Sequence, residues 1–237
     1  MAINISSGNW LSRSTNLINY NAAYTVMAWV YPNSLSDGCV FGLKQAGEGT
    51  TDNYDFWGFL GGSYYLEVAR NTPSYNATNA FPSVIGVSQF FHFAAVRSDS
   101  SNVQCYENGI PITSPASNDV SARTAIGGMV IGRYNTAFPN PLDGKLCDYL
   151  AYNRALSQAE IVNQMRSRLP LNTNNLVDWC PFINNSVNIS GGASAWTENG
   201  TLTYGDGVLL SSPPLLYPKR QTAQPTDRAS PLMLLVC

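Results

Sequence analysis

One stretch, residues 142–161, constrains the fold of this 237-residue chain more than any other. Apolar side chains fall on even positions along its first half, at Leu146, Leu150 and Tyr152, which is the period of a strand with one buried face. Ser157 and Glu160 follow at the spacing of a capping box, in which each side chain binds a backbone N–H of the other residue. The stretch therefore predicts a strand, a tight corner and the first turn of a helix.

The helix that starts at this corner is expected to be short. Ile161, Met165 and Leu169 keep helical spacing, and Pro170 ends the run because its ring cannot continue a helix. We therefore expect one helix at about residues 158–168, with Ile161 and Met165 docked against the rest of the fold.

The remaining chain has the pattern of β-strands separated by turns. Residues 24–31 are apolar on both alternate faces, which predicts a strand at the middle of a sheet, and residues 90–97 form a second strong strand. The pairs Gly61–Gly62 and Asn108–Gly109 predict hairpin turns, because these residues accept positive φ angles. Residues 71–88 are expected to be irregular. Together these patterns predict an all-β fold large enough to bury a full core.

The chain changes character from Ser211 onward. Five prolines interrupt the last 27 residues, which show no strand or helix period. We therefore expect a domain at residues 1–210 and an extended, Pro-rich C-terminal arm at residues 211–237. The arm is apolar, and exposed apolar segments usually bind a partner. The residues expected to dock on a neighbouring protein subunit are Leu215, Leu216, Tyr217, Leu232, Leu234 and Leu235.

Composition narrows the classes of partner. Charged residues make up 12% of the chain, the net charge is −2 and no basic run occurs, which argues against nucleic acid as a partner. No signal peptide is visible and no apolar run is long enough to span a bilayer, so we expect no membrane insertion. The five cysteines are scattered without a CxxC motif, which predicts free thiols rather than a zinc site or a disulfide framework.

Three blocks of sequence follow one another along the chain. They are the aromatic strand at residues 25–32, then residues 91–97 with 105–109, and finally residues 131–133 with 142–146 and 152–161. Together they resemble the concanavalin A-like, laminin-G-like jelly-roll domains. The match spans roughly residues 1–182. It departs from the family pattern at Phe91, where tryptophan is usual, and at residues 146–149, where only Asp148 remains of an acidic pair. The resemblance implies a two-sheet antiparallel jelly-roll sandwich.

This fold does not imply one function, because it hosts lectins, adhesion modules, glycoside hydrolases and viral structural proteins. Glycoside hydrolysis needs two facing carboxylates, which hydrolases of this fold carry at alternate positions of one strand. The chain has neither spacing, and the glutamates Glu67, Glu107, Glu160 and Glu198 stand alone. The single histidine, His92, lies inside a predicted strand, and no nucleophile elbow is present. We therefore expect no enzyme activity.

Two binding sites are conceivable, both near the hairpin at residues 54–70. No cofactor is required, but the family's usual ion is calcium, and its oxygen ligands would come from Asp52, Asn53 and Asp55, with Asp143 as a second location. A glycan would need an exposed aromatic platform with a nearby amide. The residues expected to form it are Tyr54, Trp57, Tyr64, Tyr65 and Asn71. The alternatives are a solvated polar loop and aromatic side chains that belong to the core.

Two functional hypotheses remain open at this point. The first is a non-enzymatic structural protein of a virion, such as a capsid decoration or tail appendage, whose arm docks on copies of itself or on capsid or tail proteins. It is motivated by the absent catalytic residues, the low charge and the apolar arm. The alternative is a carbohydrate-binding or adhesion module that recognises surface glycans.

Overall fold

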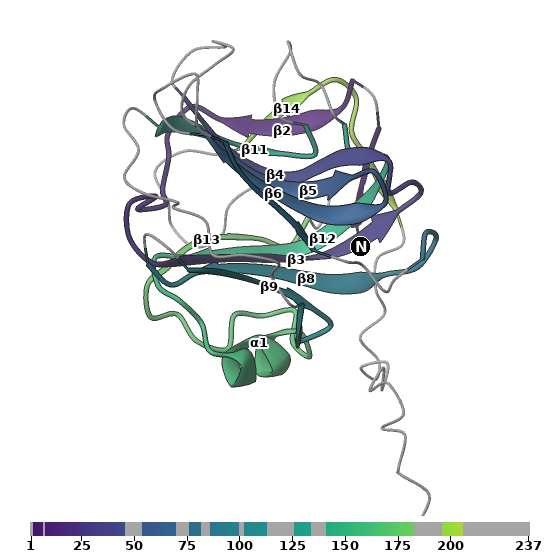
Figure 1. The fold of residues 1–237 in the computed structure, drawn as a ribbon. Helices are drawn as coiled ribbons and strands as arrows, with labels where there is room; N and C mark the ends of the chain where they lie inside the picture. Colours follow the sequence, from purple (N-terminus) through teal and green to yellow (C-terminus); the bar gives the residue numbers. More distant parts are fainter. Residues whose placement is uncertain are drawn as a thin grey trace, which may run out of the picture.

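Two antiparallel sheets pack face to face, and a short helix lies outside one of them (Figure 1). The computed structural model describes residues 2–6, 8–45, 54–69, 76–81, 86–99, 102–112, 126–133, 141–182 and 196–205. Within these residues one sheet, called sheet A, has eight strands and the other, sheet B, has seven. The predicted jelly-roll sandwich is confirmed.

Sheet A has the order β10-β9-β8-β3-β12-β1-β15, with β13 also paired to β12. Its strands are β1 (Ala2–Ile5), β3 (Tyr24–Pro32), β8 (Phe91–Arg97), β9 (Val103–Glu107), β10 (Ile110–Ile112), β12 (Gly144–Tyr152), β13 (Leu176–Cys180) and β15 (Thr203–Gly205). Sheet B has the order β14-β2-β11-β4-β5-β6-β7. Its strands are β2 (Trp10–Arg13), β4 (Asp37–Gln45), β5 (Tyr54–Leu60), β6 (Ser63–Ala69), β7 (Asn76–Phe81), β11 (Ile126–Ile131) and β14 (Thr197–Asn199).

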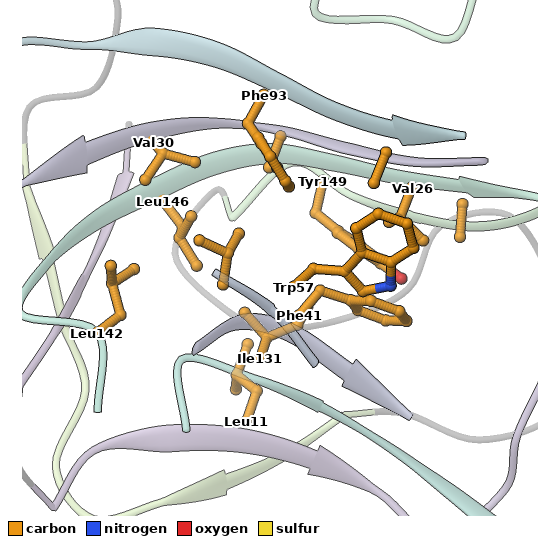
Figure 2. Packing of buried hydrophobic residues seen from close by; sticks show 14 of the residues in the cluster. Leu11, Val26, Val30, Phe41, Trp57, Phe93, Ile131, Leu142, Leu146 and Tyr149 are labelled. Carbon is orange, nitrogen blue, oxygen red and sulfur yellow. The ribbon is translucent and has the colours of Figure 1, made fainter. Parts of the chain in front are cut away.

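The core lies between the inner faces of the two sheets. Figure 2 shows Val30 and Phe93 of sheet A directed toward Phe41, Trp57 and Ile131 of sheet B. The alternate residues of β3 and β8 are buried as well, on the outer face of sheet A. A strand covered on both sides must be apolar on both sides, which is the pattern that the sequence of β3 predicted.

The helix α1 (Gln158–Gln164) covers the outer face of sheet A (Figure 1). Ile161 is fully buried against Met27, Leu150 and Tyr152, and Met165 packs partly buried beside Trp29. The predicted capping box is present. The docking of this corner on the sandwich is therefore confirmed.

The predicted one-sided period of β12 is wrong. Leu146 belongs to the core between the sheets, whereas Leu150 and Tyr152 face the helix. The reason is a bulge: Asp148 has φ 53°, and the ladder to β3 shifts register between Cys147 and Leu150. The bulge adds one residue, so even positions before and after it lie on opposite faces.

The helix also ends earlier than predicted. Its last residue is Gln164, whose side-chain amide donates to the carbonyls of Ser167 (3.1 Å) and Leu169 (3.0 Å) and accepts from the N–H of Leu171 (2.8 Å). These bonds replace a further helical turn, and Leu169 is 63% exposed instead of packed.

The remaining expectations have mixed outcomes. Both hairpin turns are confirmed, with positive φ at Gly61–Gly62 and at Asn108–Gly109. The expectation of irregular structure is wrong at residues 76–81, where β7 pairs with β6, and residues 86–88 belong to no strand. Cys39, Cys105, Cys147 and Cys180 are buried free thiols, as predicted.

The described part of the chain ends inside sheet A. β15 pairs with β1 near residue 205, so the sandwich reaches almost to the boundary expected at residue 210. The arm residues, Leu215 to Leu235, lie outside the described residues, and their docking stays a prediction. Across the described residues, no helix has the length and apolar character of a membrane span.

Candidate functional site

Trp57, a residue of the predicted glycan platform, is not accessible to a ligand. Trp57 is 0% exposed and lies in the core between the sheets (Figure 2). Its strand, β5, is an interior strand of sheet B, and the indole packs edge-on against Tyr24 with ring centroids 6.3 Å apart. A side chain enclosed in this way cannot stack on a sugar, so the prediction for Trp57 is wrong.

The other predicted ligands are only partly covered by the structure. Tyr54 belongs to β5, and Tyr64 and Tyr65 belong to β6, where the ladder aligns them with Phe59 and Gly58. The side chains of these tyrosines, like all of Asn71, lie outside what the structure describes. This part of the platform stays a prediction.

The structure describes only part of the predicted calcium site. Asp52 and Asn53 lie outside the described residues, and only the backbone of Asp55 is placed, in β5. Asp143, the second location, accepts a hydrogen bond from the amide of Asn33 (2.9 Å). Within the described residues, no three His, Cys, Asp or Glu side chains are grouped to hold a metal ion.

A cleft with a volume of about 460 Å³ lies beside α1. It lies between the helix, the end of β12 and the chain at residues 171–172. Its apolar lining comes from Tyr152, Leu156 and Leu171. Its polar lining comes from Arg154, Glu160, Asn163, Gln164, Arg166 and Asn172. We call this hollow the α1 cleft.

An ion pair forms one side of the α1 cleft. The Arg154 guanidinium donates two hydrogen bonds to the Glu160 carboxylate, from Nη1 to Oε2 (3.1 Å) and from Nη2 to Oε1 (2.7 Å). The hydrogen bonds from Arg154, and to a smaller extent the one from the backbone N–H of Ser157, lower the pKa of Glu160 to about 2. The carboxylate is therefore charged at every physiological pH.

The corner before α1 holds this ion pair in position. The Thr25 hydroxyl donates to the carbonyl of Arg154 and accepts from the N–H of Leu156, both at 2.9 Å. The side chain of Asn153 accepts from the N–H of Asn19 (2.7 Å) and donates to the carbonyl of Leu17 (3.0 Å). The corner is thus tied to β3 and to the segment before it, so the cleft is built before any ligand arrives.

Two amides lie beside this ion pair. Asn172 accepts from the N–H of Asn174 at 2.8 Å, and its Nδ2 lies 3.5 Å from Oε1 of Glu160. Asn163 is exposed on the helix. Amide, guanidinium and carboxylate groups in one hollow can bind several hydroxyl or amide groups of a polar ligand.

The cleft is not arranged for glycoside hydrolysis. That reaction needs two carboxyl groups, one of them protonated to act as general acid. Glu160 is the one carboxylate among the described lining residues, and its low pKa keeps it ionised. The described lining therefore lacks the pair of carboxyl groups that this reaction uses.

The sequence did not indicate this cleft. Glu160 was explained by the helix cap alone, and Asn163 and Asn172 follow no motif spacing. Glu160, Asn163 and Asn172 come together because α1 ends early and the chain after it returns beside the helix. Two features of the sequence could have indicated the cleft. Arg154 stands six residues before Glu160, and asparagines are dense at residues 172–175.

Residues 6–162 match the sequence profile of the concanavalin A-like lectin/glucanase superfamily, which is more than half of the chain. The chain belongs to this superfamily. The resemblance noted in the sequence is confirmed across these residues. Among curated proteins, no sequence relative was found.

Solved structures similar to this superfamily member share its fold at low identity. A provisionally assigned carbohydrate-binding protein from Bacteroides ovatus has 17% identity and a TM-score of 0.63. The alignment covers 87% of this chain but only 60% of the length of that protein. A heptameric SAP-like pentraxin from Limulus polyphemus has 17% identity and a TM-score of 0.61, with 89% of this chain and 97% of that one covered. The CBM40 domain of Ruminococcus gnavus IT-sialidase, bound to α2,3-sialyllactose, has 15% identity and a TM-score of 0.57, with 68% and 95% covered.

Two of these three structures carry carbohydrate binding in their descriptions, and none of the three descriptions names a virion. At such identities the similarity establishes the fold alone.

Proposed function

We propose that this chain is a non-catalytic carbohydrate-binding domain and that the α1 cleft holds the sugar. The observation that supports the proposal is the lining of the cleft, where a charged pair, several amides and a tyrosine meet in one hollow. Adjacent sugar hydroxyls act as donors and acceptors at fixed spacing. Amide and carboxylate groups can match both roles.

The order of the cleft also supports binding. The ion pair is fixed by five hydrogen bonds to Glu160 and its cap, and Thr25 fixes the corner that carries Arg154. A ligand that enters a preformed site spends little free energy on ordering side chains. The cleft volume of about 460 Å³ lies in the usual range for small-ligand sites.

The test is glycan binding by the full chain and by two cleft variants. A glycan array identifies a ligand, and isothermal titration then measures its affinity for the wild type, Asn172→Ala and Asn163→Ala. Each substitution removes an amide, and loss of one or two hydrogen bonds weakens binding by about threefold to tenfold. The matched control is Gln89→Ala, an exposed amide near Pro32, at the opposite end of β3 from Thr25.

The predicted platform on the β5–β6 hairpin supplies the competing location. If Tyr64→Ala or Tyr65→Ala abolishes binding and both asparagine variants bind normally, the sugar sits on the hairpin and the α1 cleft is the wrong site. If no glycan binds the wild type, the proposed function itself fails.

A further inference from the structure

We infer that the sugar bound in the α1 cleft carries an acylated amine, as in the N-acetylhexosamines. The inference rests on the proposed function and adds the class of sugar. The observation behind it is an exposed leucine in the wall of a polar cleft. Leu171 lines the cleft and is 60% exposed.

Exposed leucines are unusual in the described part of this chain. Four large hydrophobic side chains are exposed there, and the two most exposed are Leu169 (63%) and Leu171 (60%), two residues apart. They flank Pro170, and of the two only Leu171 is among the residues that line the cleft. Single exposed apolar residues are ordinary on protein surfaces, but one in the wall of a ligand-sized hollow can contact a ligand.

The leucines are held in this exposed position by the backbone around them. Gln164 bonds to three backbone groups of the segment, as described above, and its side chain is buried. The Ser167 hydroxyl adds two more bonds, donating to the carbonyl of Leu169 (2.8 Å) and accepting from its N–H (3.2 Å). Leu171 therefore stays at the cleft instead of folding onto sheet A.

A plain hexose presents ring C–H groups to such a side chain, but it carries no methyl group. An acetamido group presents two kinds of surface. Its N–H and C=O can bond to amides such as Asn163 and Asn172, and its methyl group can pack on Leu171. One substituent thus satisfies both the polar and the apolar lining of the same hollow.

The ion pair does not call for an acidic ligand. The charge of Arg154 is balanced by Glu160 through two hydrogen bonds, so this side of the cleft is electrically neutral as a unit. A neutral N-acylated sugar meets no unpaired charge from that pair.

The experiment compares matched sugars on the full-length chain. Titration by NMR or calorimetry uses three pairs: N-acetylglucosamine with glucose, N-acetylgalactosamine with galactose, and N-acetylmannosamine with mannose. In at least one pair the acylated sugar is expected to bind about fourfold tighter or better, the effect of burying one methyl group. Leu171→Ser is expected to remove this difference between the two sugars of a pair. Val87→Ser, at another exposed apolar residue, is the control.

The outcomes separate this inference from the proposed function. Equal affinity within every pair overturns the acyl preference, while sugar binding itself stands. An acyl preference that survives Leu171→Ser also overturns the inference, because the leucine then makes no contact. If neither these sugars nor any glycan on an array binds, the proposed function fails and the inference fails with it. Thermal denaturation checks that both serine variants are folded.

Discussion

His92, the single histidine of the chain, is buried in an apolar surrounding. It is 2% exposed, its ring meets Trp29 edge-on at 5.4 Å, and its Nδ1 has no hydrogen-bond partner in the part of the chain that the structure describes. Burial lowers the pKa of His92 to about 3 from its usual 6.5. The folded protein therefore keeps this side chain neutral at pH values where the unfolded chain protonates it.

This difference predicts an acid-sensitive contribution to stability. Between pH 6.5 and pH 3 the unfolded chain binds the proton and the folded chain does not, so the free energy of unfolding falls as the pH falls. For the shift given above, the loss from His92 between pH 7 and pH 4 is about 3 kcal/mol. His92→Phe keeps an aromatic ring in this position and removes the titration. Urea denaturation at pH 7 and pH 4 is expected to show a smaller loss in the variant, and equal losses in both proteins would contradict the assignment.

At the scale of the element, α1 depends on its cap. The helix has seven residues, which is too short to be stable by itself in water. Its start is fixed by the Ser157 hydroxyl, which accepts from the N–H of Glu160 at 3.3 Å, and by Glu160, which accepts from the N–H of Ser157 at 2.9 Å. Buried Ile161 then holds the helix on sheet A. The cap and this contact together position one wall of the α1 cleft.

Ser157→Ala tests the cap directly. The variant loses the hydroxyl and leaves the N–H of Glu160 unpaired, which is expected to lower the free energy of unfolding by about 0.5–2 kcal/mol. Because the cap orients Glu160, sugar affinity is expected to fall as well. Chemical denaturation and titration measure the two effects, with the exposed Ser14→Ala as control. A variant as stable as the control would show that the cap is dispensable.

The elements that were predicted correctly are the ones with a local cause. The capping box and the Asn108–Gly109 turn are decided by residues within four positions of each other, so the sequence displays them. The bulge at Asp148 follows no local motif, and its carboxylate meets Arg168, which is twenty residues away in the sequence, at 3.2 Å. The α1 cleft belongs to this second kind. Trp57 was misplaced because an aromatic side chain on a strand has the same pattern whether it faces a core or a ligand.

At the scale of the whole molecule, the segment after the superfamily match joins the two sheets. Residues 176–205 add β13 and β15 to sheet A and β14 to sheet B. A buried ion pair crosses between the sheets here, from Arg13 of β2 to Asp178 of β13 (3.1 Å), with both side chains 0% exposed. The Trp196 indole donates to the same carboxylate (3.1 Å) and lies 4.8 Å from the Arg13 guanidinium carbon.

Burial raises the pKa of Asp178 to about 6, and Arg13 offsets only part of this effect. Removing one partner of a buried pair leaves the other charge uncompensated, at a cost of about 3–5 kcal/mol. Arg13→Met should therefore destabilise the sandwich strongly at pH 8, where Asp178 must either stay charged without its partner or take up a proton from a dilute supply. At pH 5 the buried carboxyl can take up a proton in the folded state, so the destabilisation should be smaller.

The double variant Arg13→Met, Asp178→Leu leaves no buried charge and should be more stable than Arg13→Met alone at pH 8. Chemical denaturation of the three proteins at both pH values measures these differences. Equal destabilisation by Arg13→Met at pH 5 and pH 8 would show that the pair does not carry its charges into the interior.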